Sequence, residues 1–181
     1  GRVCGSTLAI YSDEKKGKAD LRIELTGAEL SESESLGKLV SKKDEIARFK
    51  IAPSSQSKAD SDLALIGKAS KTALAETEFA ADSDDQRAEW LGWCVAAGAT
   101  VPTNVDLAGK LFKALCDKVS GPERAVGLRA LAKACQADAN DGRLARTLAA
   151  NGVLTQVAGY LSSPPGQESA ARIVLYASRA D

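Results

Sequence analysis

The chain has 181 residues, with 24 Lys and Arg side chains against 24 Asp and Glu side chains. This balance argues against a generic nucleic-acid binder, which needs an excess of cations to meet the phosphate backbone. The sequence contains no histidine, which excludes Ser-His-Asp and Cys-His pairs as well as imidazole zinc ligands. The length suits one ordinary domain or two small ones and supports a self-sufficient core.

The four cysteines, Cys4, Cys94, Cys116 and Cys135, form no CxxC pair, and three of them lie within apolar helical patterns. We interpret them as structural thiols rather than metal ligands or disulfide partners. Such thiols are typical of a reducing compartment, and no apolar run reaches the length of a membrane span. The glycines form neither GxGxxG nor GxxxxGK[ST]. We therefore expect a cytoplasmic protein with no metal site and no cofactor.

The first fifty residues show the alternation that is typical of strands. TLAIYS (7–12) and DLRIELTG (20–27) alternate apolar and polar side chains, which predicts two half-buried strands. ARFKIAP (47–53) predicts a third strand, which ends at Pro53 because proline cannot donate to a ladder. The polar stretches DEKKGKA and LSESESLGKLVSKKDEIARF predict a frayed helix and a helix with a mobile edge.

From residue 60 onward the apolar period becomes helical. Helices are predicted at 59–74, 82–99, 104–122, 122–135, 142–152, 153–163 and 164–180. Asp82 or Ser83 is the expected N-cap of the second of these helices, and Asn104 that of the third. Pro122 is expected at the first helical position of the fourth, and Ser169 as the cap of the last.

This order of elements predicts an α+β chain, mostly helical, with a small β-containing subdomain at 1–78 and an all-helical subdomain at 79–181. It resembles the glutathione-transferase fold, and more narrowly its catalytically silent versions in aminoacyl-tRNA synthetases, their assembly cofactors and elongation factor one B gamma. The stretches that carry the resemblance are TLAIYSDEKKGKADLRIEL, KIAP, ADSDLALIGKAS and DQRAEWLGWC. The resemblance implies a thioredoxin-like N-terminal part with a cis-proline at Pro53. It also implies a non-catalytic protein–protein interaction or scaffolding module in a translation-associated complex.

The residues that would form a glutathione site depart from the family pattern. Tyr11 and Ser12 lie where family enzymes place the thiol-activating residue, but the segment after them lacks the apolar pattern of the family's first helix. Asp60 and Ser61 lie where an acidic-Ser pair would hold the γ-glutamyl group, at a short interval after Pro53. We therefore expect no enzyme, and a glutathione-dependent transferase using these five residues is the second alternative.

Three residues are the expected contacts with a partner. Trp90 and Trp93 are three residues apart and share one helix face, and an indole dominates the interface that it enters. Both rings could pack between the two halves of the chain; we expect Trp93 in the core and Trp90 nearer the rim. In SAAR, Ser169 is kept and Arg172 stands where the family has the Asp of a capping box. The expected partner is another protein, bound as a homo- or hetero-dimer, without direct tRNA contact and without a membrane.

The last sixty residues support a rival prediction. The stretch from RAVGLRALAKAC to ESAARIVLYAS resembles armadillo-type repeats, with a helix, a Gly-Val-Leu helix, a Ser-Pro turn and an Ala-rich helix. One such unit is not an array, since stacking needs about three repeats. The first alternative is therefore an all-α armadillo- or HEAT-like scaffold outside translation, and the strand content of the chain distinguishes the two.

Overall fold

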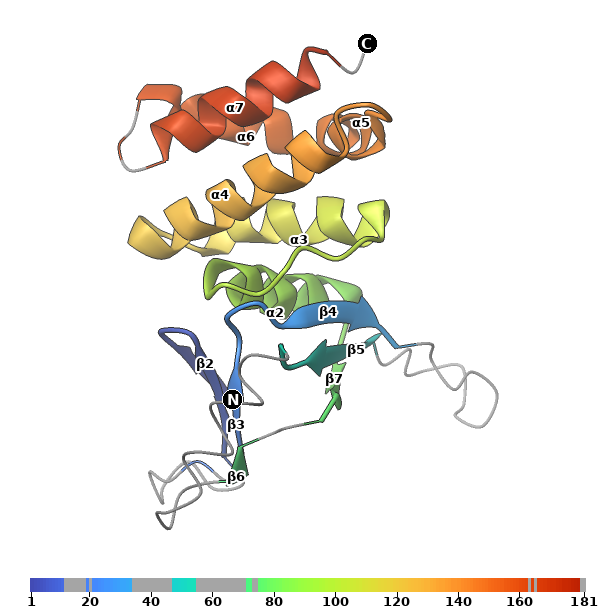
Figure 1. Ribbon diagram of the computed structural model, residues 1–181, viewed down its shortest axis with the longest axis vertical. Coiled ribbons are helices and arrows are strands. Elements are labelled where there is room, and N and C mark those ends of the chain that lie inside the picture. The colour runs from blue at the N-terminus through green and yellow to red at the C-terminus, as the bar shows by residue number, and fades with distance from the viewer. Residues whose placement is uncertain are drawn as a thin grey trace.

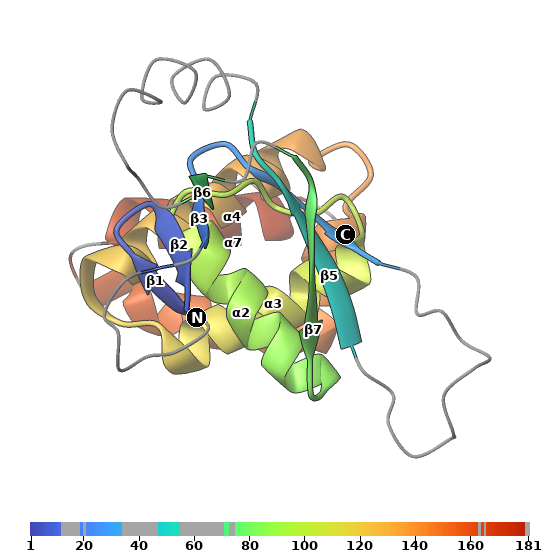
Figure 2. The ribbon, with the colours of Figure 1, turned by 90° about the horizontal axis from the view of Figure 1, so that it is seen from below.

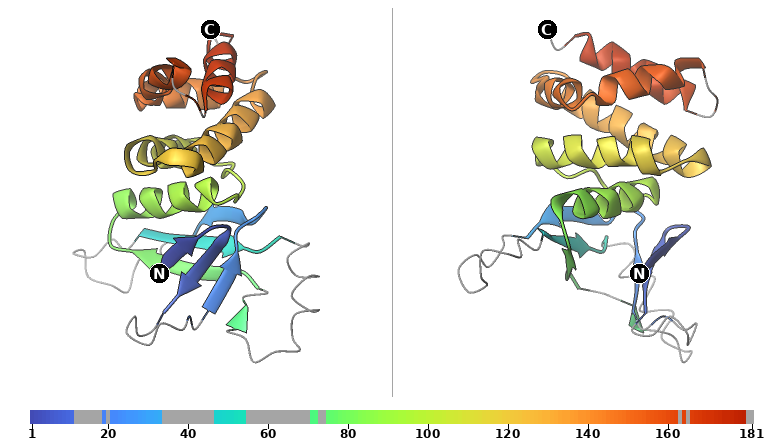
Figure 3. Two further views of the ribbon diagram at one scale, coloured as in Figure 1. Left: turned by 90° about the vertical axis from the view of Figure 1, so that its left-hand side faces the viewer. Right: turned by 180° about the vertical axis from the view of Figure 1, so that it is seen from behind.

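Strands occupy the N-terminal part of the chain and helices the remainder, in a computed structural model that describes residues 1–11, 19, 21–33, 47–54, 71–72, 75–162, 164 and 166–179. The helices stack in one column on the strands, so that the N-terminus lies among the strands and the C-terminus at the far end (Figures 1 and 3). This architecture confirms the predicted α+β order. The all-α alternative for the whole chain is wrong, because the N-terminal part forms two sheets.

The strands form two small sheets. A four-stranded sheet has the order β1-β2-β3-β6, and a three-stranded sheet has the order β4-β5-β7. Neighbouring strands are antiparallel except β3 and β6, which are parallel. The bounds are β1 (Arg2–Cys4), β2 (Thr7–Ile10), β3 (Leu21–Glu24), β4 (Glu29–Glu32), β5 (Ala47–Ala52), β6 (Lys71–Thr72) and β7 (Thr77–Ala81).

The three predicted strands are present as β2, β3 and β5. β2 and β3 pair antiparallel, with Leu8 opposite Ile23, whereas the strand-helix-strand unit of a thioredoxin-like half makes such strands parallel. β4 and β6 occupy ends of segments predicted as helices, 30–49 and 59–74, so the helix predictions are wrong there. Most of those two segments, and the frayed helix predicted at 13–19 except Ala19, lie outside the described residues.

The helices begin close to the predicted positions because their caps were visible in the sequence. Ser83 Oγ accepts a hydrogen bond from the Gln86 amide at 3.1 Å, and Asn104 Oδ1 accepts bonds from two amides of the next helix. The Ser169 cap is wrong: the last helix starts at Gln167, after Gly166. The bounds are α2 (Asp84–Ala96), α3 (Val105–Lys118), α4 (Gly121–Ala137), α5 (Arg143–Ala150), α6 (Val153–Gly159), the 3-10 turn η2 (Tyr160–Ser162) and α7 (Gln167–Ala177).

α2 joins the strands to the helices. It lies between the strands and the remaining helices (Figures 1 and 2) and packs against β5, β7, α3 and α4. Backbone hydrogen bonds reinforce this junction: Gly27 N donates to Gly98 O at 2.9 Å, and Thr100 N donates to Ala28 O at 2.8 Å. One apolar cluster continues from Leu8 in β2 to Ile173 in α7. The predicted subdomain boundary between residues 78 and 79 falls inside β7.

The later helices repeat the packing of the earlier ones. α6 packs on α3 and α7 packs on α4, so that the pair α6–α7 lies on the pair α3–α4, with α5 against α3 and α6. Stacking of equivalent helices on one another is the way in which helical-repeat proteins bury a continuous core. α4 contacts both α2 and α7, so that it lies between these two helices.

Candidate interaction surface

The first hollow on the molecule lies between α2 and β1. It has a volume of about 490 Å³ and is lined by Trp90 and Trp93, with Gln86 and Glu89 from the same helix and residues 1–4 on the other side. Both indoles are half-buried and pack against the apolar core, so Trp93 is not fully buried as expected. Both rings lie on the side of α2 that borders β1, a short strand that was not predicted from the sequence.

A second hollow, the α2–α4 groove, lies between the end of α2 and the outward face of α4. Its volume is about 510 Å³, and it is lined mainly by small apolar side chains of the two helices. Val126 is 38% exposed on the α4 side, which is unusual for a branched apolar residue of this chain. The lining residues are Val95, Gly98, Ala99, Thr100, Val101, Val126, Arg129, Ala130, Lys133 and Ala134.

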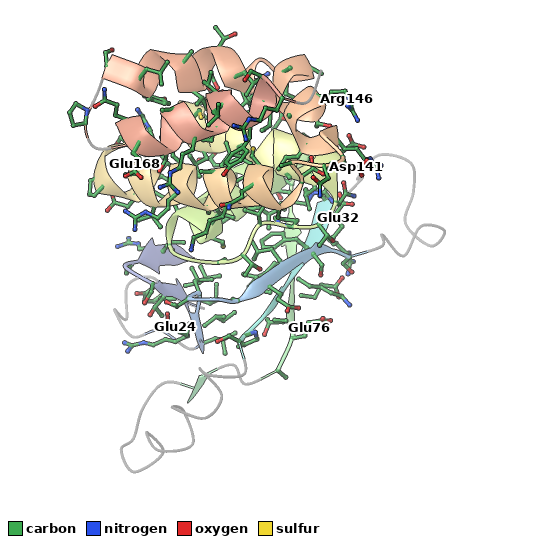
Figure 4. The ribbon with its side chains drawn as sticks, turned by 45° about the horizontal axis from the view of Figure 1, so that its top comes forward. Glu24, Glu32, Glu76, Asp141, Arg146 and Glu168 are labelled. Carbon is green, nitrogen blue, oxygen red and sulfur yellow. The ribbon has the colours of Figure 1, made fainter. Side chains whose placement is uncertain are left out.

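A third and smaller hollow, the α4–α7 pocket, lies on the other side of α4. It has a volume of about 180 Å³ and is lined by Arg129, Ala132, Lys133, Gln136, Glu168, Ser169 and Arg172. Figure 4 shows Glu168 beside α4 at the start of α7, on the opposite side of the view from Glu32. Arg129 and Lys133 line both hollows, so the α2–α4 groove and the α4–α7 pocket form one continuous surface across α4.

This surface carries an excess of positive charge. Arg172 Nη2 lies 2.7 Å from Glu168 Oε1, an exposed pair one turn apart on α7. Arg129 and Lys133 are exposed and have no ion pair within the part of the chain that the structure describes. Three cations therefore face one carboxylate around the pocket, and an anion there would meet little competition from the protein's own acids.

The candidates for a glutathione site are only partly described. Tyr11 is half-buried just after β2, and Pro53 is buried just after β5, so the two follow strands of different sheets. Ser12, Asp60 and Ser61 lie outside the described residues. The described residues therefore include two of the five candidates, Tyr11 and Pro53. Arg172, the third partner candidate, lies on α7, whereas both tryptophans lie on α2, so the structure places them on different hollows.

The cysteines are poor nucleophiles with one exception. Burial raises the pKa of the Cys94 and Cys135 thiols from 9.0 to about 12, and that of Cys116 to about 11. A thiol that stays protonated at neutral pH neither attacks an electrophile nor binds a metal. Cys4 is exposed at the rim of the tryptophan hollow. Among the described residues no group of three or more Cys, Asp and Glu side chains is arranged to hold a metal ion.

Arg129, Lys133 and Val126 were not among the partner-binding residues predicted from the sequence. The apolar stripe of α4 consists of Leu128, Leu131, Ala132 and Cys135, which are buried. The available signal was the i, i+4 repeat of Arg129 with Lys133 beside Val126 and Ala130, a cationic row next to an apolar one.

Comparisons with known proteins add no family to this description. No protein-family model matches the chain, and neither a curated protein nor a solved structure matches it. No helix in the described ranges is both long and apolar enough to span a membrane.

Proposed function

We propose that this chain is a non-catalytic protein–protein interaction module, in which the helical column presents the binding surface and the sheets brace one end. The observation that carries the proposal is the surface across α4, where an apolar groove and a cationic pocket share Arg129 and Lys133. Apolar lining beside unpaired charge is a common composition of protein-binding surfaces. The proposed location of the module is the cytoplasm.

The chemistry of the chain supports binding rather than catalysis. There is no histidine to act as a base near neutral pH. The three buried thiols are held protonated, and the described glutathione candidates, Tyr11 and Pro53, follow strands of different sheets. A thiol-conjugation assay with glutathione separates the transferase alternative from the proposal: we expect no turnover and no retention on immobilised glutathione.

Two classes of partner follow from the two sequence resemblances. Similarity to the silent transferase-like domains favours subunits of aminoacyl-tRNA synthetase or elongation-factor complexes, and these are the first partners to test. The second class is proteins outside translation, which the chain would bind as a helical-repeat scaffold. It is favoured by the stacking of α6 on α3 and of α7 on α4, which is the packing that armadillo-like units would use.

The test is capture from a cytosolic extract on the immobilised chain, followed by identification of the retained proteins. We expect a reproducible set of partners that resists free glutathione. Synthetases or elongation-factor subunits in that set would support the first class, and other proteins the second. A column that retains nothing beyond a denatured-chain control, in extracts from several growth conditions, would refute the interaction module itself.

A further inference from the structure

We infer that the surface across α4 binds an extended acidic segment of a partner protein, with an apolar side chain of that segment in the α2–α4 groove and a carboxylate or phosphate group in the α4–α7 pocket. The inference rests on the proposed function, because it names the chemistry of the partner and the place where it docks. Neither tryptophan takes part in it, since both line the separate hollow beside β1.

Charge complementarity identifies the partner as acidic. Arg129, Lys133 and Arg172 surround the pocket, and Glu168 neutralises only Arg172, with which it is paired at 2.7 Å. Arg129 and Lys133 have no ion pair among the described residues, so both remain available to a ligand. A guanidinium can hold a carboxylate or phosphate through two parallel hydrogen bonds, which fix the orientation of the ligand as well as stabilising its binding.

The shape of the surface identifies the partner as an extended chain. The groove of about 510 Å³ and the pocket of about 180 Å³ lie on adjoining faces of α4, with Arg129 and Lys133 between them, and a segment that crosses a helix spans up to its width of about 10 Å. An extended chain advances about 3.3 Å per residue. An apolar side chain and an acidic one about three residues further along would therefore reach the two hollows together.

A nucleic acid fits this surface less well. The chain as a whole has no net charge, whereas a continuous phosphate backbone needs an excess of cations along its length. The groove beside the pocket is lined by Val95, Val101, Val126 and alanines, which offer nothing to a base edge or a ribose but accept an aliphatic side chain. Binding of single-stranded RNA in preference to peptide is thus a contrary outcome of the test below.

The experiment is a selection from a displayed library of random peptides of about ten residues on the immobilised chain. It compares the native chain with Arg129→Glu/Lys133→Glu and with a control, Lys113→Glu/Arg143→Glu, which makes the same change in net charge at exposed positions outside both hollows. All four side chains are exposed, so equal urea midpoints are expected and show that the variants are folded. Single peptides from the selection, and a labelled oligouridylate, are then measured by fluorescence anisotropy.

The native chain and the control are expected to enrich peptides with an apolar residue followed about three positions later by Asp or Glu. The charge-reversed variant should bind those peptides at least about ten-fold more weakly, and should enrich Lys and Arg at the acidic position. Raising the salt from about 50 to about 300 mM should weaken binding to the native chain. Adding a phosphoserine at the acidic position tests whether phosphate binds better than carboxylate.

Three results would overturn the inference: no enrichment on the native chain, enriched peptides without acidic residues, or tighter binding of the oligouridylate than of any peptide. Equal affinity for native and charge-reversed protein would do the same. Its failure is distinguishable from failure of the proposed function. If both proteins capture the same partners from the extract, the module stands and only this surface is wrong; if the native chain captures none, the module itself is wrong.

Discussion

Arg87 Nη2 lies 2.9 Å from Glu32 Oε1, and this ion pair ties α2 to β4. The same nitrogen lies 3.1 Å from Asp84 Oδ1, and Nη1 donates to the Arg48 carbonyl of β5 at 3.4 Å. Glu32 in turn accepts a hydrogen bond from Asn104 Nδ2, at the start of α3, at 2.9 Å. Arg87 is the buried charged residue of the described chain, with 9% of its surface exposed. One guanidinium therefore connects the three-stranded sheet to the helical column.

Arg87→Ala is expected to destabilise the chain by about 1.5–3 kcal/mol, because hydrogen bonds to charged groups are lost and Glu32 keeps only its hydrogen bond from Asn104. Urea unfolding followed by circular dichroism measures the change. The matched control is Lys110→Ala, which removes the 3.5 Å contact of Lys110 with Asp84, a pair that is half exposed on both sides. That exposed pair should be worth only a few tenths of a kcal/mol. Equal losses in the two variants would contradict a structural role for the Arg87 contacts.

Gly92→Ala is expected to destabilise the chain by about 1–2 kcal/mol, although alanine is the better helix former. A Cβ at this position would lie 3.1 Å from Leu111 O and 3.3 Å from Leu115 N, so α2 and α3 would have to move apart. The control is Gly159→Ala in α6, where a Cβ meets nothing within 4 Å. The control should leave stability unchanged or raise it by up to about 1 kcal/mol, as measured by thermal unfolding. A stabilised Gly92→Ala protein would mean that the two helices are not in close contact.

Cys4 is expected to be the thiol that reacts in the folded chain at pH 8, and Cys94, Cys116 and Cys135 should react only in denaturant. Mass spectrometry after brief alkylation identifies the labelled positions. A naphthalene fluorophore on Cys4 should also quench both Trp90 and Trp93 by energy transfer, since all three residues line one hollow. Single-Trp variants, Trp90→Phe and Trp93→Phe, should show similar transfer; strong transfer from one ring alone would contradict the geometry described here.

Stability is expected to fall as the pH rises above about 9. The buried thiols have their pKa raised to about 11 or 12, so the folded chain keeps protons that the unfolded chain releases near pH 9. Since the unfolded state then binds fewer protons, the free energy of unfolding decreases with pH, by about 1 kcal/mol per thiol between pH 9 and pH 10. Urea unfolding at these two pH values measures the slope. Cys135→Ala should reduce the decrease by about a third, and an unchanged slope would count against this cause.

The helices were predictable because their signals are local. α2, α3 and α4 run for 13 to 17 residues with one apolar stripe each, and Ser83, Asn104 and Pro122 mark their starts. The start of α7 was not predicted correctly. Its N-cap is Gly166 with φ 123°, and the sequence PPGQES contains no local signal for this conformation. Ser169 sits in a helical turn instead of before it.

The missed strands carry too little sequence signal. β6 has two residues and β1 three, so neither can show a period of two. In β4 only Leu30 is buried, and the surrounding Glu and Ser residues look like an exposed helix or loop. β4 is recognisable only through its partner, because Leu30 lies opposite Ile51 of β5 across the sheet. Pairing of this kind joins positions some twenty residues apart and is not visible in a local pattern.

The candidate surface could not be predicted either, because its residues come from three helices that are separated in the sequence. Arg129 and Lys133 look like ordinary exposed cations on the polar side of α4. Their importance comes from neighbours supplied by the end of α2 and the start of α7, on either side of α4. The tryptophans show the converse: their identity and spacing were informative, but the hollow that they line is completed by β1, which the sequence did not reveal.

α7 belongs to the last layer of the column and packs on α4, α5, α6 and η2, with Leu175 48% exposed on its outer side. In an array where each layer touches only the next, opening starts at an end and travels inward. Amide protons of α7 would accordingly exchange with solvent before those of α3, which has helices on both sides. A segment bound across α4 and α7 would hold these two helices together and slow exchange in α7, so that occupancy of the surface would oppose local opening of α7.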